Sequence, residues 1–139
     1  MHHIGKKAVT AVLAMIVVGC SSTPEDLDKS TSAARTTKTY SENYQEVYRR
    51  LVRTARLCSG GPSGRYTAFQ LSTDLYSDLG YGEVSLSLYN LGTHNFYWKA
   101  KIEKAGEGSK LSVVSGNSLA QASQLRSVVD WADGGTKCL

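Results

Sequence analysis

Apolar side chains recur every three or four residues in two parts of the chain, which is the spacing of one face of an α-helix. The first part spans 40–57, begins at a capping box formed by Thr39 and Glu42, and ends at a glycine-rich stretch. The second part spans about 119–133 and is followed by Gly134-Gly135, a pair that commonly ends a helix. The sequence therefore predicts one helix at each end of the folded region.

Between these helices, apolar and polar residues alternate in four consecutive runs, which is typical of strands with one buried face. In the third run, Phe96 and Trp98 are expected on the inner face and Tyr97 on the outer face. Glycine-containing connections favour hairpins and hence an antiparallel meander with both helices on its inner face. The predicted fold class is α+β: N-terminal helix, four-stranded antiparallel meander, C-terminal helix. The predicted strands are Arg65–Thr73, Glu83–Leu91, Asn95–Lys104 and Lys110–Ser115.

The N-terminus has the parts of a secretory signal: a positively charged start, the apolar run 8–18 and a small residue before Cys20. This run is too short to cross a bilayer as a helix, which takes about 17–25 residues. Val17-Val18-Gly19-Cys20 matches the lipobox, and in this part the chain resembles a bacterial lipoprotein precursor. The resemblance implies cleavage before Cys20 and its acylation with chains such as palmitate. In such lipoproteins an Asp after the acylated Cys favours retention at the inner membrane. Here Ser21 stands at that position, so the resemblance implies the outer membrane. The alternative is an ordinary secretory signal, although no A-x-A site is better placed.

We therefore expect three regions: a lipoprotein signal peptide at 1–19, the acylated Cys20 with a flexible tether at 20–39, and a single α+β domain at 40–139. The Ser/Thr-rich composition of the tether leaves it little apolar surface to bury, although a partner-binding segment is the alternative. Removing the two lysines of the signal peptide lowers the formal net charge from +4 to +2. Such a small charge gives no support for nucleic-acid binding.

With Cys20 acylated, Cys58 and Cys138 remain as one even pair in an exported protein. We expect a disulfide between them. The alternative is a pair of reduced thiols in which Arg56 lowers the pKa of Cys58.

The least regular stretch of the chain is the best candidate for a functional surface. Its tyrosines could form a surface for a glycan or a protein partner, or they could fold over the sheet edge as part of the core. Its carboxylates could in principle bind Ca²⁺, but their spacing does not match an EF-hand loop. The residues of this possible binding surface are Asp74, Tyr76, Asp78, Tyr81 and Glu83.

Four arginines of the first predicted helix form a second candidate, Arg49, Arg50, Arg53 and Arg56. They could bind anionic lipid headgroups or another polyanion, or they could form a solvated helix face.

No catalytic, metal-binding or cofactor-binding pattern is recognisable. His94 is the only histidine left after signal removal, and no nucleophile motif accompanies it. Trp98 and Trp131 are expected to be core anchors. We therefore expect a non-enzymatic outer-membrane lipoprotein, held by lipid at Cys20 and facing the periplasm. Its domain would be an accessory or protein-interaction module with an envelope protein as partner. The alternative is a periplasmic binding protein for a small ligand, glycan or cation.

Overall fold

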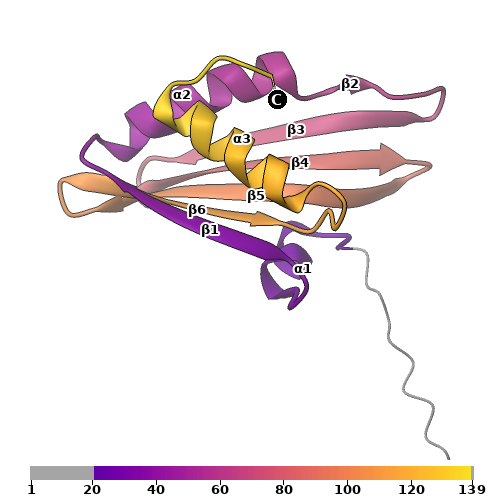
Figure 1. Ribbon diagram of the computed structural model, residues 1–139, viewed down its shortest axis with the longest axis horizontal. Coiled ribbons are helices and arrows are strands. Elements are labelled where there is room, and N and C mark those ends of the chain that lie inside the picture. The colour runs from indigo at the N-terminus through magenta and orange to yellow at the C-terminus, as the bar shows by residue number, and fades with distance from the viewer. Residues whose placement is uncertain (1–20, 139) are drawn as a thin grey trace, which may run out of the picture.

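Residues 21–138, the part of the chain that the computed structural model describes, form three helices and six strands (Figure 1). The predicted signal peptide and Cys20 lie outside these residues. In chain order the elements are α1 (Pro24–Lys29), β1 (Ala34–Tyr40), α2 (Tyr44–Cys58), β2 (Gly61–Pro62), β3 (Thr67–Tyr76), β4 (Tyr81–Asn90), β5 (Thr93–Ala105), β6 (Gly108–Ser115) and α3 (Gln121–Asp133).

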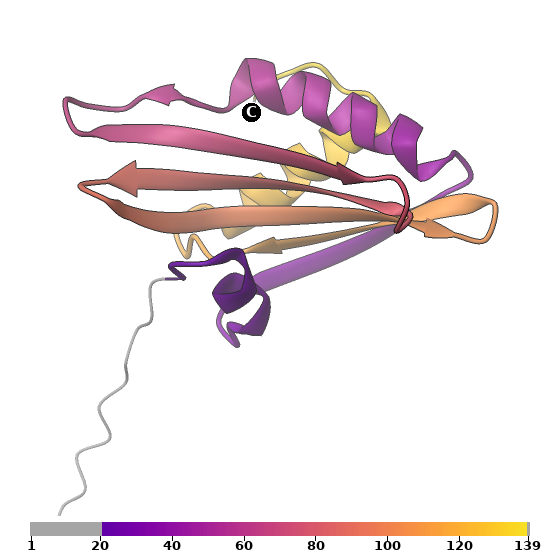
Figure 2. The same ribbon diagram turned by 180° about the vertical axis from the view of Figure 1, so that it is seen from behind.

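The strands form one antiparallel sheet in the order β1-β6-β5-β4-β3-β2. Strands β3 to β6 follow one another as a meander, as the alternating runs predict. Helices α2 and α3 cover one face, called the inner face here, and α1 packs on the opposite, outer face (Figures 1 and 2). None of the helices within 21–138 has the length and apolar character needed to cross a membrane.

The prediction of a four-stranded meander with two helices is wrong, because the sheet has six strands and there are three helices. The additional helix α1 and all of strand β1 except Tyr40 lie in 20–39, which the sequence predicts to be a tether. Helix α1 starts with a capping box between Thr23 and Asp26 and buries Leu27 completely. Every residue of β1 pairs with a residue of β6, so backbone bonds hold this strand although it lacks an apolar alternation.

The first long helix also begins later than its apolar spacing predicts. Tyr40 is the last residue of β1 and pairs with Ser109 of β6. The helix starts at Tyr44, where the side chain of Asn43 accepts a hydrogen bond from the backbone N–H of Gln45. Tyr40 therefore belongs to the sheet, although its apolar spacing places it in the predicted helix.

A β-bulge in β5 breaks the predicted alternation of inner and outer residues. Leu86 pairs with Trp98 and Ser87 pairs with Phe96, which leaves Tyr97 as the extra residue. Tyr97 consequently packs against the core beside Trp98, while Phe96 stacks on the outer face with the ring of His94. The expectation that Phe96 faces inward and Tyr97 outward is wrong for this reason.

The expected disulfide between Cys58 and Cys138 is confirmed, with Cα atoms 5.1 Å apart. It joins the end of α2 to the C-terminal segment that follows α3. Two hydrogen bonds also hold this segment: Thr54 Oγ1 donates to the carbonyl of Gly135, and Trp131 Nε1 donates to the carbonyl of Lys137. These contacts fix the C-terminal segment against α2 and α3.

Candidate functional site

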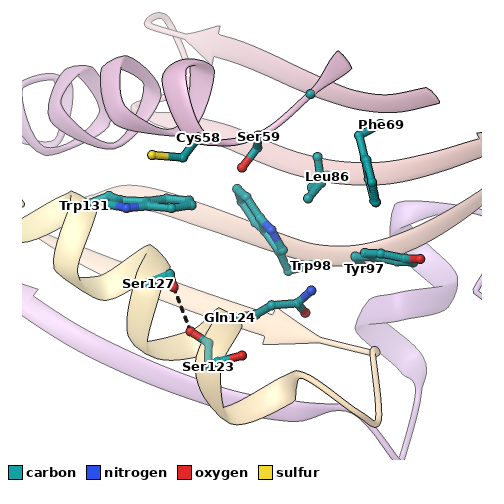
Figure 3. A pocket seen from close by; sticks show the side chains of 11 residues that line it. Cys58, Ser59, Phe69, Leu86, Tyr97, Trp98, Ser123, Gln124, Ser127 and Trp131 are labelled. Carbon is teal, nitrogen blue, oxygen red and sulfur yellow. Dashed lines mark hydrogen bonds between the residues drawn. The ribbon is translucent and has the colours of Figure 1, made fainter. Parts of the chain in front are cut away.

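A cavity of about 280 Å³ lies between the inner face of the sheet and α3, beside the end of α2 (Figure 3). It is open on one side, and its volume lies just below the range of about 300–1,000 Å³ for small-molecule sites. Five parts of the chain contribute to it: the end of α2 with the loop that follows, β3, β4, β5 and α3. The lining residues are Cys58, Ser59, Gly60, Phe69, Leu86, Tyr97, Trp98, Ser123, Gln124, Ser127 and Trp131.

Four aromatic rings line the cavity. The rings of Trp98 and Trp131 meet edge to face with centroids 6.3 Å apart, and those of Phe69 and Tyr97 do so at 5.6 Å. Both tryptophans are buried, as their role of core anchors predicts. Figure 3 shows these four rings around the same space, with the polar residues of α3 along one side.

The fold positions these rings through two local features. The bulge in β5 places Tyr97 and Trp98, which are consecutive in sequence, together on the cavity side. The hydrogen bond from Trp131 to the carbonyl of Lys137, 2.8 Å long, fixes the indole on α3. Because Cys58 lines the cavity and is bonded to Cys138, the disulfide holds the same wall together.

The polar groups of the cavity are few and neutral. Gln124 Oε1 accepts a hydrogen bond of 2.6 Å from Ser115 Oγ, and within 21–138 its Nε2 has no hydrogen-bond partner. The hydroxyl of Ser123 donates to the carbonyl of Ala120, which precedes α3, and the hydroxyl of Ser127 donates to the carbonyl of Ser123, so only their lone pairs remain for another molecule. No aspartate, glutamate, lysine or arginine is among the lining residues. The cavity therefore suits an uncharged ligand with an apolar ring and one hydrogen-bond acceptor.

The structure brings four of the five residues of the predicted binding surface together on the outer face. Asp74 and Glu83 are cross-strand partners, as are Tyr76 and Tyr81, and the two tyrosine rings have centroids 4.8 Å apart. Asp78 lies in the turn between β3 and β4. The tyrosines therefore do not fold into the inner core.

Ion pairs already engage part of this surface. The ammonium of Lys99 lies 3.2 Å from Glu83 Oε1 and 2.8 Å from Asp28 Oδ2. Burial disfavours the charged form of Lys99, but the hydrogen bonds and negative charges of these two carboxylates outweigh it and raise the pKa of the lysine. Lys99 thus links α1 to the sheet and engages Glu83 as its second partner.

The exposed end of the same surface is acidic and aromatic. The negative charge of Asp74 raises the pKa of the Tyr76 phenol above its ordinary value. The ammonium of Lys101 lies 4.7 Å from the centroid of the Tyr81 ring. No group of three or more His, Cys, Asp or Glu side chains within the described residues is arranged to hold a metal ion.

The only histidine of the described chain pairs with a serine, but not in a catalytic arrangement. Ser87 Oγ and His94 Nδ1 are 3.1 Å apart on the outer face. The serine side chain is almost completely buried, and no carboxylate within 21–138 contacts the histidine. A triad needs an accessible nucleophile and an orienting acid, so this pair has a structural role.

Sequence reasoning missed the cavity. Phe69, Tyr97, Trp98 and Trp131 are recognisable as aromatic residues, but strict alternation places Tyr97 on the outer face. Aromatic residues two positions apart or adjacent on a strand do not reveal whether a helix packs tightly over them. The gap between α3 and the sheet depends on the position of α3, which the C-terminal disulfide fixes.

No protein-family model matches the chain. No curated protein sequence is significantly similar to it. Similar solved structures include DynU16, a protein of the dynemicin biosynthetic locus, at 14% identity and a TM-score of 0.45. They also include protein CV1439 from Chromobacterium violaceum, at 12% identity and a TM-score of 0.34.

The similarity to DynU16 covers 76% of this chain and 46% of DynU16, so the chain spans less than half the length of that protein. The similarity to CV1439 covers 74% of this chain and 95% of CV1439. Both TM-scores are below 0.5, so the role of the cavity has to follow from its own residues.

Proposed function

We propose that the protein is an outer-membrane lipoprotein whose periplasmic domain binds a small neutral ligand with an aromatic or other apolar ring. The observation that supports this function is the cavity, which has aromatic walls, no charged lining residue and a hydrogen-bond donor at Gln124. The disulfide between Cys58 and Cys138 supports an oxidising compartment such as the periplasm. The domain acts in this proposal as a binding protein and not as an enzyme.

The proposed anchor would meet the folded domain without a spacer. The carbonyl of Ser21 accepts a hydrogen bond of 3.0 Å from the backbone N–H of Phe96, and α1 starts at Pro24. An acyl chain on Cys20 would therefore keep this end of β5 close to the membrane surface. The tether that the sequence predicts would not separate the two.

The ligand proposal predicts saturable quenching of the tryptophan fluorescence by 4-bromobenzyl alcohol. Trp98 and Trp131 are the two tryptophans of the chain, and both line the cavity, so the emission reports on this site alone. The experiment uses the full-length protein in detergent micelles and compares this alcohol with bromobenzene. We expect tighter binding of the alcohol, because its oxygen can accept a hydrogen bond from Gln124 Nε2.

A variant that introduces a phenylalanine at the cavity tests where the ligand binds. Ser123 is exposed on α3 and lines the cavity, so Ser123→Phe should weaken binding by about tenfold or more without changing the free energy of unfolding by more than about 0.5 kcal/mol. The control is Ala122→Phe, at the next exposed position of α3 and outside the cavity lining. Quenching that rises linearly without saturation, or equal affinity in both variants, would contradict the proposal.

A second candidate function is the accessory or protein-interaction module that the sequence favours, with an envelope protein as partner. The observation in its favour is the outer-face surface of Asp74, Tyr76, Tyr81 and Glu83, in which Tyr76 is 38% exposed. Tyrosines on an accessible surface are enriched at protein interfaces.

Cross-linking in intact envelopes tests this second function. A Tyr76→Ser and Tyr81→Ser double variant should lose a cross-linked partner that the wild type retains. Tyr66→Ser is the control, because Tyr66 is 64% exposed and lies outside this surface. A partner that survives the double variant would show that this surface does not bind it.

A further inference from the structure

Most of β3 is an open edge of the sheet. Strand β2 pairs only with Ala68 and Phe69, and no other strand lies beyond β3 in the described chain (Figure 2). The carbonyl of Thr67 accepts a hydrogen bond from the N–H of Ser63 on this open side. Backbone groups point to the same side at every second residue of a strand. The N–H and C=O groups of Leu71, Thr73 and Leu75 therefore point away from β4 and lack a strand partner.

The two edges of the sheet differ in their protection against strand addition. Exposed edges are usually blocked by Lys, Arg or Pro, by bulges or by a covering element. The opposite edge, β1, carries Arg35 and Lys38, and the side chain of Lys38 pairs with Asp133 of α3. Strand β3 contains no Lys, Arg or Pro over its ten residues. The β3 edge therefore remains competent for pairing.

A groove of about 750 Å³ runs between α2 and the open edge of β3. Leu57 on α2 and Leu75 on β3 line it and are 78% and 45% exposed. Strand β3 contributes the floor through Thr73 and Leu75, and α2 contributes the wall. The full lining is Gln45, Tyr48, Arg49, Val52, Arg53, Arg56, Leu57, Thr73 and Leu75.

The groove is positively charged. Three arginines line it and no carboxylate does. Arg49 pairs with Glu46 at 2.8 Å, and Arg56 donates to Thr73 Oγ1 at 3.1 Å. Within 21–138, Arg53 is exposed and forms no hydrogen bond or ion pair. Arg50, the fourth arginine of the predicted face, lies apart from the groove and pairs with Glu42.

We propose that the β3 edge and this arginine groove together bind an acidic, extended peptide segment of another protein, which adds to the sheet as a further strand. The backbone of the segment would bond with Leu71, Thr73 and Leu75. Side chains of β3 at these same positions face the inner side of the sheet, toward α2. Every second side chain of the added strand would thus face the arginines of the groove. These positions would favour Glu or Asp.

Two other occupants fit less well. A second copy of this chain that paired its β3 edge with this one would bring two arginine grooves together, which is electrostatically unfavourable. An anionic membrane would neutralise the arginines but would leave the backbone groups of the β3 edge without partners. An acidic peptide strand would neutralise the arginines and would also form hydrogen bonds with the backbone groups of the β3 edge.

The experiment uses a fluorescein-labelled octapeptide of alternating Glu and Val, titrated with the full-length protein in detergent micelles and followed by fluorescence anisotropy. We expect binding of this peptide and at least about tenfold weaker binding of the Lys/Val counterpart. Arg53→Glu should weaken binding by about tenfold. Arg126→Glu, a charge reversal at an exposed position of α3, should leave it unchanged. Equal affinity for both peptides, or equal effects of both variants, would overturn the proposal.

N-methylated peptides distinguish strand addition from simple charge attraction. In an antiparallel added strand the amides of the inward-facing Glu residues bond with β3, whereas in a parallel strand the amides of the Val residues do. Methylating the Glu amides should therefore abolish binding of an antiparallel strand, and methylating the Val amides that of a parallel strand. Loss of binding for one isomer supports the proposal. Retention by both, or loss by both, would overturn it.

Discussion

Replacing both Cys58 and Cys138 with alanine should lower the free energy of unfolding by about 4–5 kcal/mol. The two residues are separated by 80 positions, and a cross-link that closes a loop of this length removes that much conformational entropy from the unfolded chain in the chain-entropy model. Small domains have a total stability of only about 5–15 kcal/mol. The variant is therefore expected to be close to unfolding at growth temperature.

Chemical denaturation of the wild type, with and without reductant, and of the double variant measures this effect. The reduced wild type should match the variant, because both lack the cross-link. The disulfide also holds the C-terminal segment to which Trp131 bonds, so tryptophan emission should shift in both samples even before unfolding. A difference in unfolding free energy below about 1 kcal/mol would show that the cross-link contributes little.

The second large effect is expected at the bulge in β5. Trp98→Ala should cost about 3–5 kcal/mol, because a 2%-exposed tryptophan at the centre of the core leaves a large void. Phe96→Ala should cost clearly less, about 1–2 kcal/mol, because Phe96 lies on the outer face against His94. Urea denaturation of both variants measures the difference.

This pair of variants distinguishes the bulged strand β5 from a strand with regular alternation. If β5 alternated without a bulge, Phe96 and Trp98 would share the inner face and both substitutions would cost several kcal/mol. Equal losses in the two variants would thus contradict the register in which Ser87 pairs with Phe96. The same register places Tyr97 in the cavity, so the result bears on the proposed ligand site as well.

The local sequence pattern was sufficient to predict those segments that are stabilised by contacts on their own apolar face. Helices α2 and α3 and the strands β3 to β6 carry such faces, and the sequence predicts all of them, with errors at their ends. The cross-strand pairing of Asp74 with Glu83 and of Tyr76 with Tyr81 was not predicted, because the pattern ends one strand at Thr73 and starts the next at Glu83. The disulfide follows from the count of cysteines, given the expectation that Cys20 is acylated.

The pattern was insufficient where a partner distant in sequence decides the conformation. Strand β1 has mostly exposed side chains and exists because the backbone of β6, from Ser109 to Ser115, bonds to it. Helix α1 is short and has one buried apolar residue, Leu27, which needs the outer face of the finished sheet. A helix of this length is not stable alone.

The α+β class, the strands β3 to β6, the two long helices and the pairing of Cys58 with Cys138 could be predicted from the sequence, because apolar periodicity and cysteine number are properties of the chain. Three features required the packed molecule: residues 21–40 belong to the fold, Tyr97 joins Trp98 at an aromatic cavity, and the arginines of α2 lie beside an open strand edge. Each of these features depends on which backbone groups and surfaces stay unpaired after distant segments have packed. A local sequence pattern does not contain that information.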